Sequence, residues 1–187
     1  MFNDRTKLER VHLDELTKIG NMFDTMDIGY CVIDSHAMLS YGITAKSPFP
    51  YTMMVEAKNK DKIMRTIFKL NYIIASLSPE VLSIKKNEKG GELNINICFC
   101  TETEKKISLK TGNRTIFFPV KMFSQERKET CTQKCGKGYF RVAPLEALYL
   151  LKMDDNAESL YDLETIKQSG KMDFDKLLEL FEINGLL

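Results

Sequence analysis

Apolar and polar residues follow a helical period at the two ends of the chain and a strand period in parts of its middle. In residues 7–26, apolar side chains recur at roughly helical spacing with charged residues between them, which predicts an amphipathic helix. The apolar positions are Leu8, Val11, Leu16, Ile19 and Phe23. Residues 30–34 then form a short run that predicts a strand, and residues 36–42 predict a short helix that ends at Gly42.

The middle of the chain predicts further strands around a helix. Residues 51–57 are an apolar run typical of a strand, and residues 58–72 predict a helix with one apolar face. Residues 91–100 alternate strictly between apolar and polar side chains, which predicts a strand with two different faces. Residues 114–123 predict another strand or strand pair, and the polar, glycine-containing residues 124–139 predict a flexible loop.

Helices are predicted again at the end of the chain, in residues 144–170 and 173–187, with Asp173 as the N-cap of the last one. The resulting order, α-β-α-β-α-β-β-α-α, predicts an α+β domain in which helices flank a mixed sheet. We expect residues 1–140 to form this α/β core and residues 141–187 to form a C-terminal helical segment packed on it.

The composition indicates a soluble globular protein without a strong charge bias. Of its 187 residues, 43% are hydrophobic and 28% are charged, and the net charge of +1 favours neither nucleic acid nor membrane as a partner. No apolar run reaches the roughly 18 residues that a membrane-spanning helix needs, and the first segment is amphipathic rather than a signal peptide. Five cysteines without a secretory signal indicate free thiols and a cytoplasmic location.

Five segments occur in the order and spacing of a known family: VIDSHAMLSYGI, PYTMMVEA, LNINICF, APLEALYLLKM and ESLYDLETI. Together they resemble the minimal nucleotidyltransferase superfamily over most of residues 9–170, especially the branch of AbiEii-type toxins and similar stand-alone domains. Members of this family commonly have a strand leading to G-[GS], a short helix, a strand with D-x-D and a third carboxylate on a later strand. A P-x-x-L-x-x-L-K segment and K-D-x-x-D-L follow. The resemblance implies a nucleotidyltransferase-like sheet and a reaction in which carboxylate-bound Mg²⁺ orients a triphosphate.

The chain departs from the family pattern at each metal-binding acid. The D-x-D positions match Pro50 and Thr52, and the third carboxylate matches Asn96. Neutral threonine and asparagine lack the anionic oxygens that offset the desolvation of a divalent ion. At the G-[GS] turn, Asp34 replaces the glycine and adds a negative charge, while Ser35 is retained. These departures predict a catalytically inactive nucleotidyltransferase-fold protein that holds no metal.

Displaced acids offer an alternative site. Asp34 and Glu56 end neighbouring predicted strands, so they are the best candidates for a non-standard Mg²⁺ pair, with Glu92 as a further acid. In the other interpretation, Asp34 is a turn or helix-cap residue.

His36 lies beside Asp34 and Ser35, a combination that suggests nucleophilic catalysis. Adjacent residues do not normally form a triad, however, so we expect His36 to be a surface or capping residue.

Four cysteines form a candidate metal site. Cys131 and Cys135 are spaced C-x3-C in the predicted loop, and Cys98 and Cys100 lie on the alternating strand. Four thiolates are a chemically reasonable zinc site, but the usual spacing in zinc ribbons is C-x2-C. We therefore favour small buried hydrophobes on the strand and free thiols in the loop.

The C-terminal motif retains Lys152 and Asp162, whereas Ser159 replaces the other expected aspartate. The resemblance implies that the lysine lies near the nucleotide phosphates and that the aspartate helps to fix the C-terminal helix pair. In the alternative interpretation, both side chains are simply exposed. We expect Lys152 to be exposed, so that its replacement by alanine leaves stability nearly unchanged. The candidate ligand-binding residues are Ser35, Thr52, Asn96 and Lys152.

Three functions follow from these observations. The favoured hypothesis is a binding or regulatory module for a nucleotide or another anionic small molecule. The second is an active nucleotidyltransferase that uses Asp34 and Glu56 with Mg²⁺, the one case in which a cofactor is expected. The third is an antitoxin-like or scaffold protein that binds a protein partner. A basic and aromatic group in the loop gives a less favoured contact with RNA. It consists of Lys134, Lys137, Tyr139 and Arg141.

Overall fold

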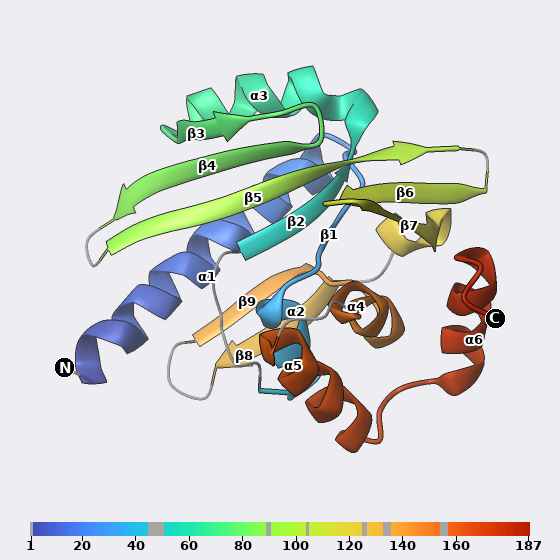
Figure 1. Ribbon diagram of the computed structural model, residues 1–187. Helices are drawn as coiled ribbons and strands as arrows, with labels where there is room; N and C mark the ends of the chain where they lie inside the picture. Colours follow the sequence, from blue (N-terminus) through green and yellow to red (C-terminus); the bar gives the residue numbers. More distant parts are fainter. Residues whose placement is uncertain are drawn as a thin grey trace.

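A mixed, curled β-sheet forms the centre of the protein, and helices flank it (Figure 1). The computed structural model describes residues 2–44, 51–88, 91–103, 105–124, 127–132, 136–153 and 157–187. The strands of the sheet are β1 Tyr30–Val32, β2 Tyr51–Glu56, β3 Ile73–Leu77, β4 Val81–Glu88, β5 Gly91–Glu102, β6 Lys106–Thr111 and β7 Arg114–Pro119. A separate hairpin consists of β8 Arg127–Thr132 and β9 Gly136–Arg141. The helices are α1 Phe2–Thr25, α2 Ser35–Ser40, α3 Lys60–Lys69, α4 Leu145–Lys152, α5 Ala157–Gln168 and α6 Phe174–Ile183, with short 3-10 turns η1 Ala57–Asn59 and η2 Val120–Ser124.

The strand order places β2 and β5 at the middle of the sheet. Among the described residues the order is β1-β2-β5-β4-β3, and β6 and β7 extend the sheet from the far end of β5. β2 and β5 run parallel, whereas the other neighbouring strands of the sheet are antiparallel. A parallel pair needs a long crossover connection, and η1, α3 and the β3–β4 hairpin supply it.

One face of the sheet is covered by α1 and α3, and we call it the helix-covered face. The ring of Phe23 in α1 meets the ring of Tyr30 edge to face, with centroids 5.5 Å apart. Ile63 and Ile67 of α3 are fully buried. Fully buried sheet residues on this face are Tyr30, Val32, Tyr51, Met53, Val55, Leu93, Ile95 and Ile97. Since burying one such apolar side chain contributes about 1.5–3 kcal/mol, this face supplies much of the folding energy.

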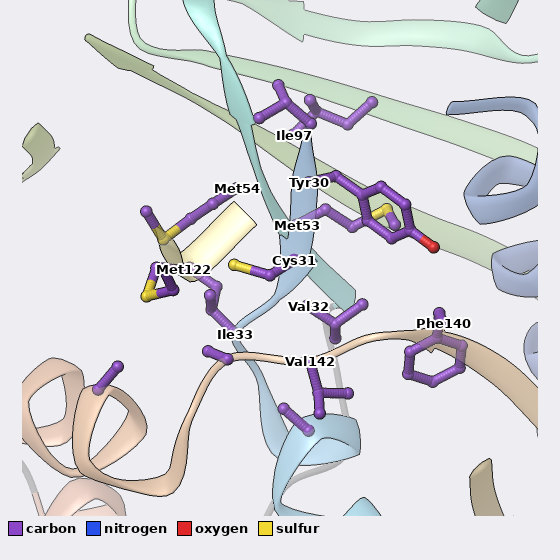
Figure 2. Close-up of a cluster of buried hydrophobic side chains, with 14 of the residues drawn as sticks. Tyr30, Cys31, Val32, Ile33, Met53, Met54, Ile97, Met122, Phe140 and Val142 are labelled. Atoms are coloured by element: carbon purple, nitrogen blue, oxygen red, sulfur yellow. The ribbon is translucent and has the colours of Figure 1, made fainter. Parts of the chain in front are cut away.

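The opposite face is only partly covered. Figure 2 shows Cys31 pointing toward Met54 and Met122, on the side of β1 away from Tyr30. Cys31, Met54 and Met122 are buried there. Farther along the same face, Thr52 and Asn96 are half-buried, so this side of the sheet carries a polar strip next to an apolar patch.

A buried carboxylate fixes α1 on the sheet. Glu15 of α1 accepts hydrogen bonds from Lys86 Nζ at 2.8 Å and from the Tyr72 hydroxyl at 2.9 Å, and it also accepts one from Lys18. Burial raises the pKa of Glu15, but these three hydrogen bonds outweigh burial and hold the pKa below its usual value. The ionised carboxylate therefore joins α1, β4 and the segment before β3.

The α+β prediction is confirmed, and the first, middle and last helices lie where the pattern placed them. Asp173 caps α6 by accepting from the backbone N–H groups of Asp175 and Lys176, as expected. Gly42 follows α2 with φ of +71°, a conformation that suits glycine at a helix end.

The structure contains strands that the sequence pattern did not predict. β3, β4 and β6 were not predicted, although Ile107 and Leu109 of β6 and Leu82 and Ile84 of β4 alternate with polar residues and are buried. β3 lies at the sheet edge with Ile73 and Leu77 exposed, so burial does not impose a period of two on it.

The prediction of a loop for residues 124–139 is wrong in its described part, which forms the β8–β9 hairpin. Phe140 of β9 is fully buried, and β9 packs beside α1, a contact that no local pattern reveals.

None of the described helices has both the length and the apolar character needed to cross a membrane.

Gly20 allows α1 to approach β1 closely, and this contact gives a test of the packing. A Cβ atom at Gly20 would overlap the Tyr30 hydroxyl. We expect Gly20→Ala to destabilise the protein by about 1–3 kcal/mol in urea unfolding, although alanine favours the helix by about 1 kcal/mol. Combining it with Tyr30→Phe removes the overlapping oxygen, so the double variant should lose less stability than the sum of the single variants. Additive losses would contradict the predicted contact.

Candidate functional site

The turn between β1 and α2 is held by the side chain of Asp34. Asp34 has an extended backbone (φ −105°, ψ −163°) and serves as the N-cap of α2. Its Oδ1 accepts from the backbone N–H of His36 at 2.7 Å, and its Oδ2 accepts from the backbone N–H of Thr52 at 2.5 Å. The carboxylate thus joins the start of α2 to the start of β2. The interpretation of Asp34 as a cap residue is confirmed, and its bond to β2 is an addition that the sequence did not reveal.

The environment of Asp34 makes its charge costly. Only 8% of the residue is exposed. Burial raises the pKa of Asp34 to about 7, although hydrogen bonds from the backbone of Thr52, His36 and Ala37 and the charge of Lys152 all lower it. The carboxyl group therefore changes its charge close to neutral pH rather than near its ordinary value of 3.8.

Lys152 reaches the same region from the end of α4. Its Nζ forms an ion pair of 2.7 Å with Oδ2 of Asp162 in α5. The side chain of Asp162 is 2% exposed and that of Lys152 is 24% exposed. This corrects the interpretation of both as exposed residues: Lys152 balances a buried carboxylate and also acts electrostatically on Asp34. We call Asp34, Thr52, Lys152 and Asp162 the Asp34 cluster.

Thr52 and Asn96 lie side by side in the sheet. They are register partners in the parallel pair of β2 and β5, so both side chains point to the same face, which is the opposite face. Asn96 Oδ1 accepts a hydrogen bond of 2.8 Å from the Ser83 hydroxyl on β4. Pro50 lies outside the described residues, and Ser35 is described only as the first residue of α2. At the two described positions where the resemblance implies carboxylates, the structure places neutral side chains.

The displaced-acid pair is not brought together. Asp34 bonds to Thr52 at the start of β2, whereas Glu56 is the last residue of β2. At a strand rise of about 3.3 Å per residue, the two ends lie roughly 13 Å apart, which is too far for one shared ion. Glu56 instead forms an ion pair of 3.1 Å with Lys58 and accepts from the Asn59 side chain at 2.8 Å. Glu92 is exposed and paired with Lys85 at 3.1 Å.

His36 lies in the interior, which corrects the expectation of a surface residue. The residue is 1% exposed, and its ring centroid is 4.3 Å from that of Tyr51. The Tyr51 hydroxyl also meets Nδ1 of His12 at 2.7 Å, so both histidines of the chain flank this tyrosine. Burial, and to a smaller extent His12, lowers the pKa of His36 to about 3. Such a weakly basic imidazole is poorly suited to activating a hydroxyl group at neutral pH.

The structure describes only some of the remaining candidates, which are the cysteines and the lysines of the predicted loop. Cys98 and Cys100 follow one face of β5, and burial raises the pKa of Cys98 to about 11, so its thiol is protonated at neutral pH. Cys135 and Lys134 fall outside the described residues, and Cys131 and Lys137 are described only by their place in the hairpin. Among the described side chains, none gathers into a metal-binding group of three or more His, Cys, Asp or Glu.

Arg141, a member of the basic and aromatic group, is bound within the protein and is not part of an open basic surface. The guanidinium of Arg141 forms an ion pair of 3.0 Å with Asp24 and donates to the carbonyl of Phe123 at 3.2 Å. Tyr139 is 43% exposed. Arg141 therefore fastens β9 to the end of α1.

A cavity of about 580 Å³ lies away from the Asp34 cluster. It is bounded by α4, α6, η2 and the residue after α2, and no member of the cluster lines it. Its charged lining residues are Lys121, Glu146, Lys171, Asp173, Lys176 and Glu179. Basic and acidic residues are equal in number in this lining, so these side chains give the cavity no net charge.

Solved structures show which fold this arrangement belongs to. No protein-family model and no curated protein matches the chain. The crystal structure of the lincosamide antibiotic adenylyltransferase LnuA, lincomycin-bound, is similar over 83% of this chain and 96% of that chain, with a TM-score of 0.55 and 16% identity. The solution structure of the antibiotic-resistance factor ANT(2'')-Ia is similar over 96% of this chain and 91% of that chain, with a TM-score of 0.55 and 7% identity. At such identities the likeness shows the fold alone, which is nucleotidyltransferase-like.

The raised pKa of Asp34 predicts how stability changes with pH. The folded protein binds a proton on Asp34 more tightly than the unfolded chain does, so the contribution of Asp34 is full below about pH 4 and is lost as pH rises to about 7. We expect the free energy of unfolding to fall over this window by on the order of 2–4 kcal/mol from this group. Urea unfolding across pH 4–8 measures the slope, and Asp34→Asn should flatten it.

A second helix cap provides the control for this slope. Asp173 also accepts backbone hydrogen bonds at a helix start, but its pKa is lowered by Lys176 and it lies near the surface. Asp173→Asn should therefore leave the slope between pH 5 and 7 unchanged. If Asp34→Asn and Asp173→Asn shift the curve equally, Asp34 is not the titrating group.

The ion pair between Lys152 and Asp162 revises the expectation for Lys152→Ala. Removal of the ammonium group leaves a buried carboxylate without its balancing charge, so the loss should be about 2–3 kcal/mol in urea unfolding. Lys176→Ala breaks a Lys–Asp pair of similar length, 2.9 Å, between exposed side chains and should leave stability nearly unchanged. Equal effects of the two variants would show that burial of Asp162 is unimportant.

Proposed function

We propose that this protein is a nucleotidyltransferase-fold binding or regulatory module that does not carry out metal-dependent nucleotidyl transfer. Its ligand is a nucleotide or another anionic small molecule, bound on the opposite face between β2, β5 and the end of α4. Within the superfamily, the resemblance of the five segments favours the AbiEii-like, stand-alone branch. The observation that carries the proposal is the in-register pair of neutral side chains, Thr52 and Asn96.

The residues of the site do not fit a catalytic Mg²⁺. A divalent ion requires anionic oxygen ligands, and Thr52 and Asn96 supply a neutral hydroxyl and a neutral amide. Asn96 Oδ1 already accepts from Ser83. Each carboxylate oxygen of Asp34 accepts one backbone N–H, so an ion at Asp34 would have to share these oxygens with the turn that Asp34 caps. No step of a transfer reaction is therefore assigned to these residues.

The same side chains suit weak binding of one anionic group. Thr52 offers a hydroxyl donor, Asn96 an amide donor, and Lys152 a partly exposed ammonium group. A ligand must share Lys152 with Asp162 and approach Asp34, and both carboxylates oppose an anion. We expect micromolar affinity at best, about 8 kcal/mol or less.

A protein-binding role is the second candidate, and the edge of the sheet supports it. β3 ends the sheet on one side, with Ile73 and Leu77 about half exposed, and Phe68 at the end of α3 is 61% exposed. An apolar sheet edge is suited to pairing with a strand of another chain. The active-transferase hypothesis has less support, because Asp34 and Glu56 lie at opposite ends of β2.

Calorimetric titration distinguishes these functions. ATP, GTP, CTP and UTP are titrated with Mg²⁺ or with EDTA, and lincomycin is added to the panel because it is bound in the neighbour LnuA. We expect metal-independent binding of at least one nucleotide and no transfer of label to protein or RNA. Metal-dependent binding with transfer that is lost in Asp34→Asn or Glu56→Gln would establish the enzyme. A complete lack of binding would favour the protein-binding role.

Restoring acids tests whether the site keeps the geometry of a metal site. In Thr52→Asp/Asn96→Asp, two carboxylates stand on neighbouring strands at the same level of the opposite face. We expect this double variant to gain Mg²⁺ binding at millimolar concentrations, measured by calorimetry, whereas the natural protein binds none there. The control is Thr101→Asp/Ser108→Asp, another in-register pair of neutral residues, on β5 and β6. Equal Mg²⁺ binding by both double variants would contradict a specific site.

A further inference from the structure

We propose that the cavity between α4 and α6 is a second binding site, for a small organic molecule whose protonated amine pairs with Glu146. The same ligand carries an anionic group beyond an apolar body, as an ω-amino acid does. No member of the Asp34 cluster lines this cavity. The second site is therefore independent of the anion site on the opposite face, and either site can fail while the other stands.

Contacts at both ends of α6 fix one wall of the cavity. At the end of α6, the side chain of Asn184 accepts from the Phe117 N–H at 2.8 Å and donates to the Phe117 carbonyl at 2.9 Å, which holds α6 on β7. At the start of α6, the N–H of Asp173 donates to Oε1 of Glu146 in α4 at 2.7 Å. The cavity volume of about 580 Å³ falls within the range of small-molecule sites, roughly 300–1,000 Å³.

Glu146 is a buried residue with one carboxylate oxygen left open. It is 6% exposed, and among the described residues only the Asp173 N–H donates a hydrogen bond to it. The second oxygen, Oε2, is not sealed from solvent, and because Glu146 lines the cavity, this oxygen faces it. Two lysines of the lining have other partners: Lys176 pairs with Asp173 at 2.9 Å, and Lys171 donates to the Tyr41 carbonyl. Since a buried carboxylate is normally paired with a cation, this one is suited to a cation from a ligand.

The rest of the lining indicates the other parts of the ligand. The buried apolar residues of the wall are Met122, Leu145, Ala147 and Leu180. The exposed basic residues of the lining are Lys121, Lys171 and Lys176. These lysines repel an ammonium group and attract an anionic group. A zwitterion whose two charges are separated by an apolar body therefore fits the cavity better than a simple amine or a simple acid.

Three probes with the same six-carbon chain test this ligand class: 6-aminohexanoate, hexylamine and hexanoate. In calorimetric titration we expect 6-aminohexanoate to bind with a dissociation constant of about 1 mM or less, hexylamine to bind more weakly and hexanoate not to bind. The proposal is overturned if hexylamine or hexanoate binds as tightly as 6-aminohexanoate. It is also overturned if none of the three binds at concentrations up to about 20 mM.

Glu146→Gln tests the role of the carboxylate. The glutamine amide oxygen can still accept from the Asp173 N–H, so α6 keeps its contact with α4. Loss of the charge-assisted hydrogen bond to the amine should weaken the binding of 6-aminohexanoate by about tenfold or more. Glu182→Gln is the matched control, because it removes an exposed glutamate of α6 outside the lining and should leave the affinity unchanged. Equal affinities of the natural protein and Glu146→Gln overturn the proposal.

Thermal unfolding separates a loss of binding from a loss of fold. We expect Glu146→Gln to unfold at or above the temperature of the natural protein, since it removes a buried charge without an ion pair. Should Glu146→Gln not fold, the ranking of the three probes on the natural protein still decides the outcome.

Discussion

The hydrogen bonds from the backbone N–H groups of His36 and Thr52 to the carboxylate of Asp34 fix the relation between the β1–α2 turn and the centre of the sheet. β1 has only three residues and pairs with β2, so its ladder alone provides few hydrogen bonds. Past the end of β1, the Ile33 N–H donates to the Thr52 carbonyl at 3.0 Å. The Asp34 carboxylate accepts from the Thr52 N–H and starts α2 at the same time, so it helps to fix α2 against the start of β2.

The β1–α2 turn departs from the pattern that the resemblance implies, although the fold is nucleotidyltransferase-like. The resemblance implies a glycine at this turn, where exposed N–H groups approach a phosphate. Here the carboxylate of Asp34 accepts from the backbone N–H groups of His36 and Thr52. Thr52 and Asn96 are neutral where the resemblance implies acids, and they are register partners in the β2–β5 pairing. The helix-covered face supplies much of the folding energy, and neither Thr52 nor Asn96 lies on it.

Burial connects the charges of the site to the stability of the fold. Asp34 and Asp162 are both nearly inaccessible to water, and Lys152 partly compensates the two. A change in the charge of such a group therefore alters the free energy of unfolding.

The sequence by itself determined the α+β class, the long helices and the alternation of residues 91–100, because these depend on local periodicity and on burial of a continuous apolar face. Through an ordered set of motifs it also indicated that Thr52 and Asn96 occupy matching positions on two strands, and the structure pairs them in register. The sequence did not predict β3, whose exposed edge position imposes no alternation. It also did not predict the β8–β9 hairpin, in which β9 packs beside α1 and β8 beside α2.

Only the tertiary structure decided the chemistry of the site. The distance between Asp34 and Glu56 follows from the antiparallel pairing of β1 with β2. The sequence pattern does not show whether two strands pair parallel or antiparallel. The burial of His36 beside Tyr51 and the pairing of Lys152 with Asp162 join residues from different elements. The charge of a buried side chain is set by desolvation and by its nearest partner. Both depend on the folded arrangement of several elements.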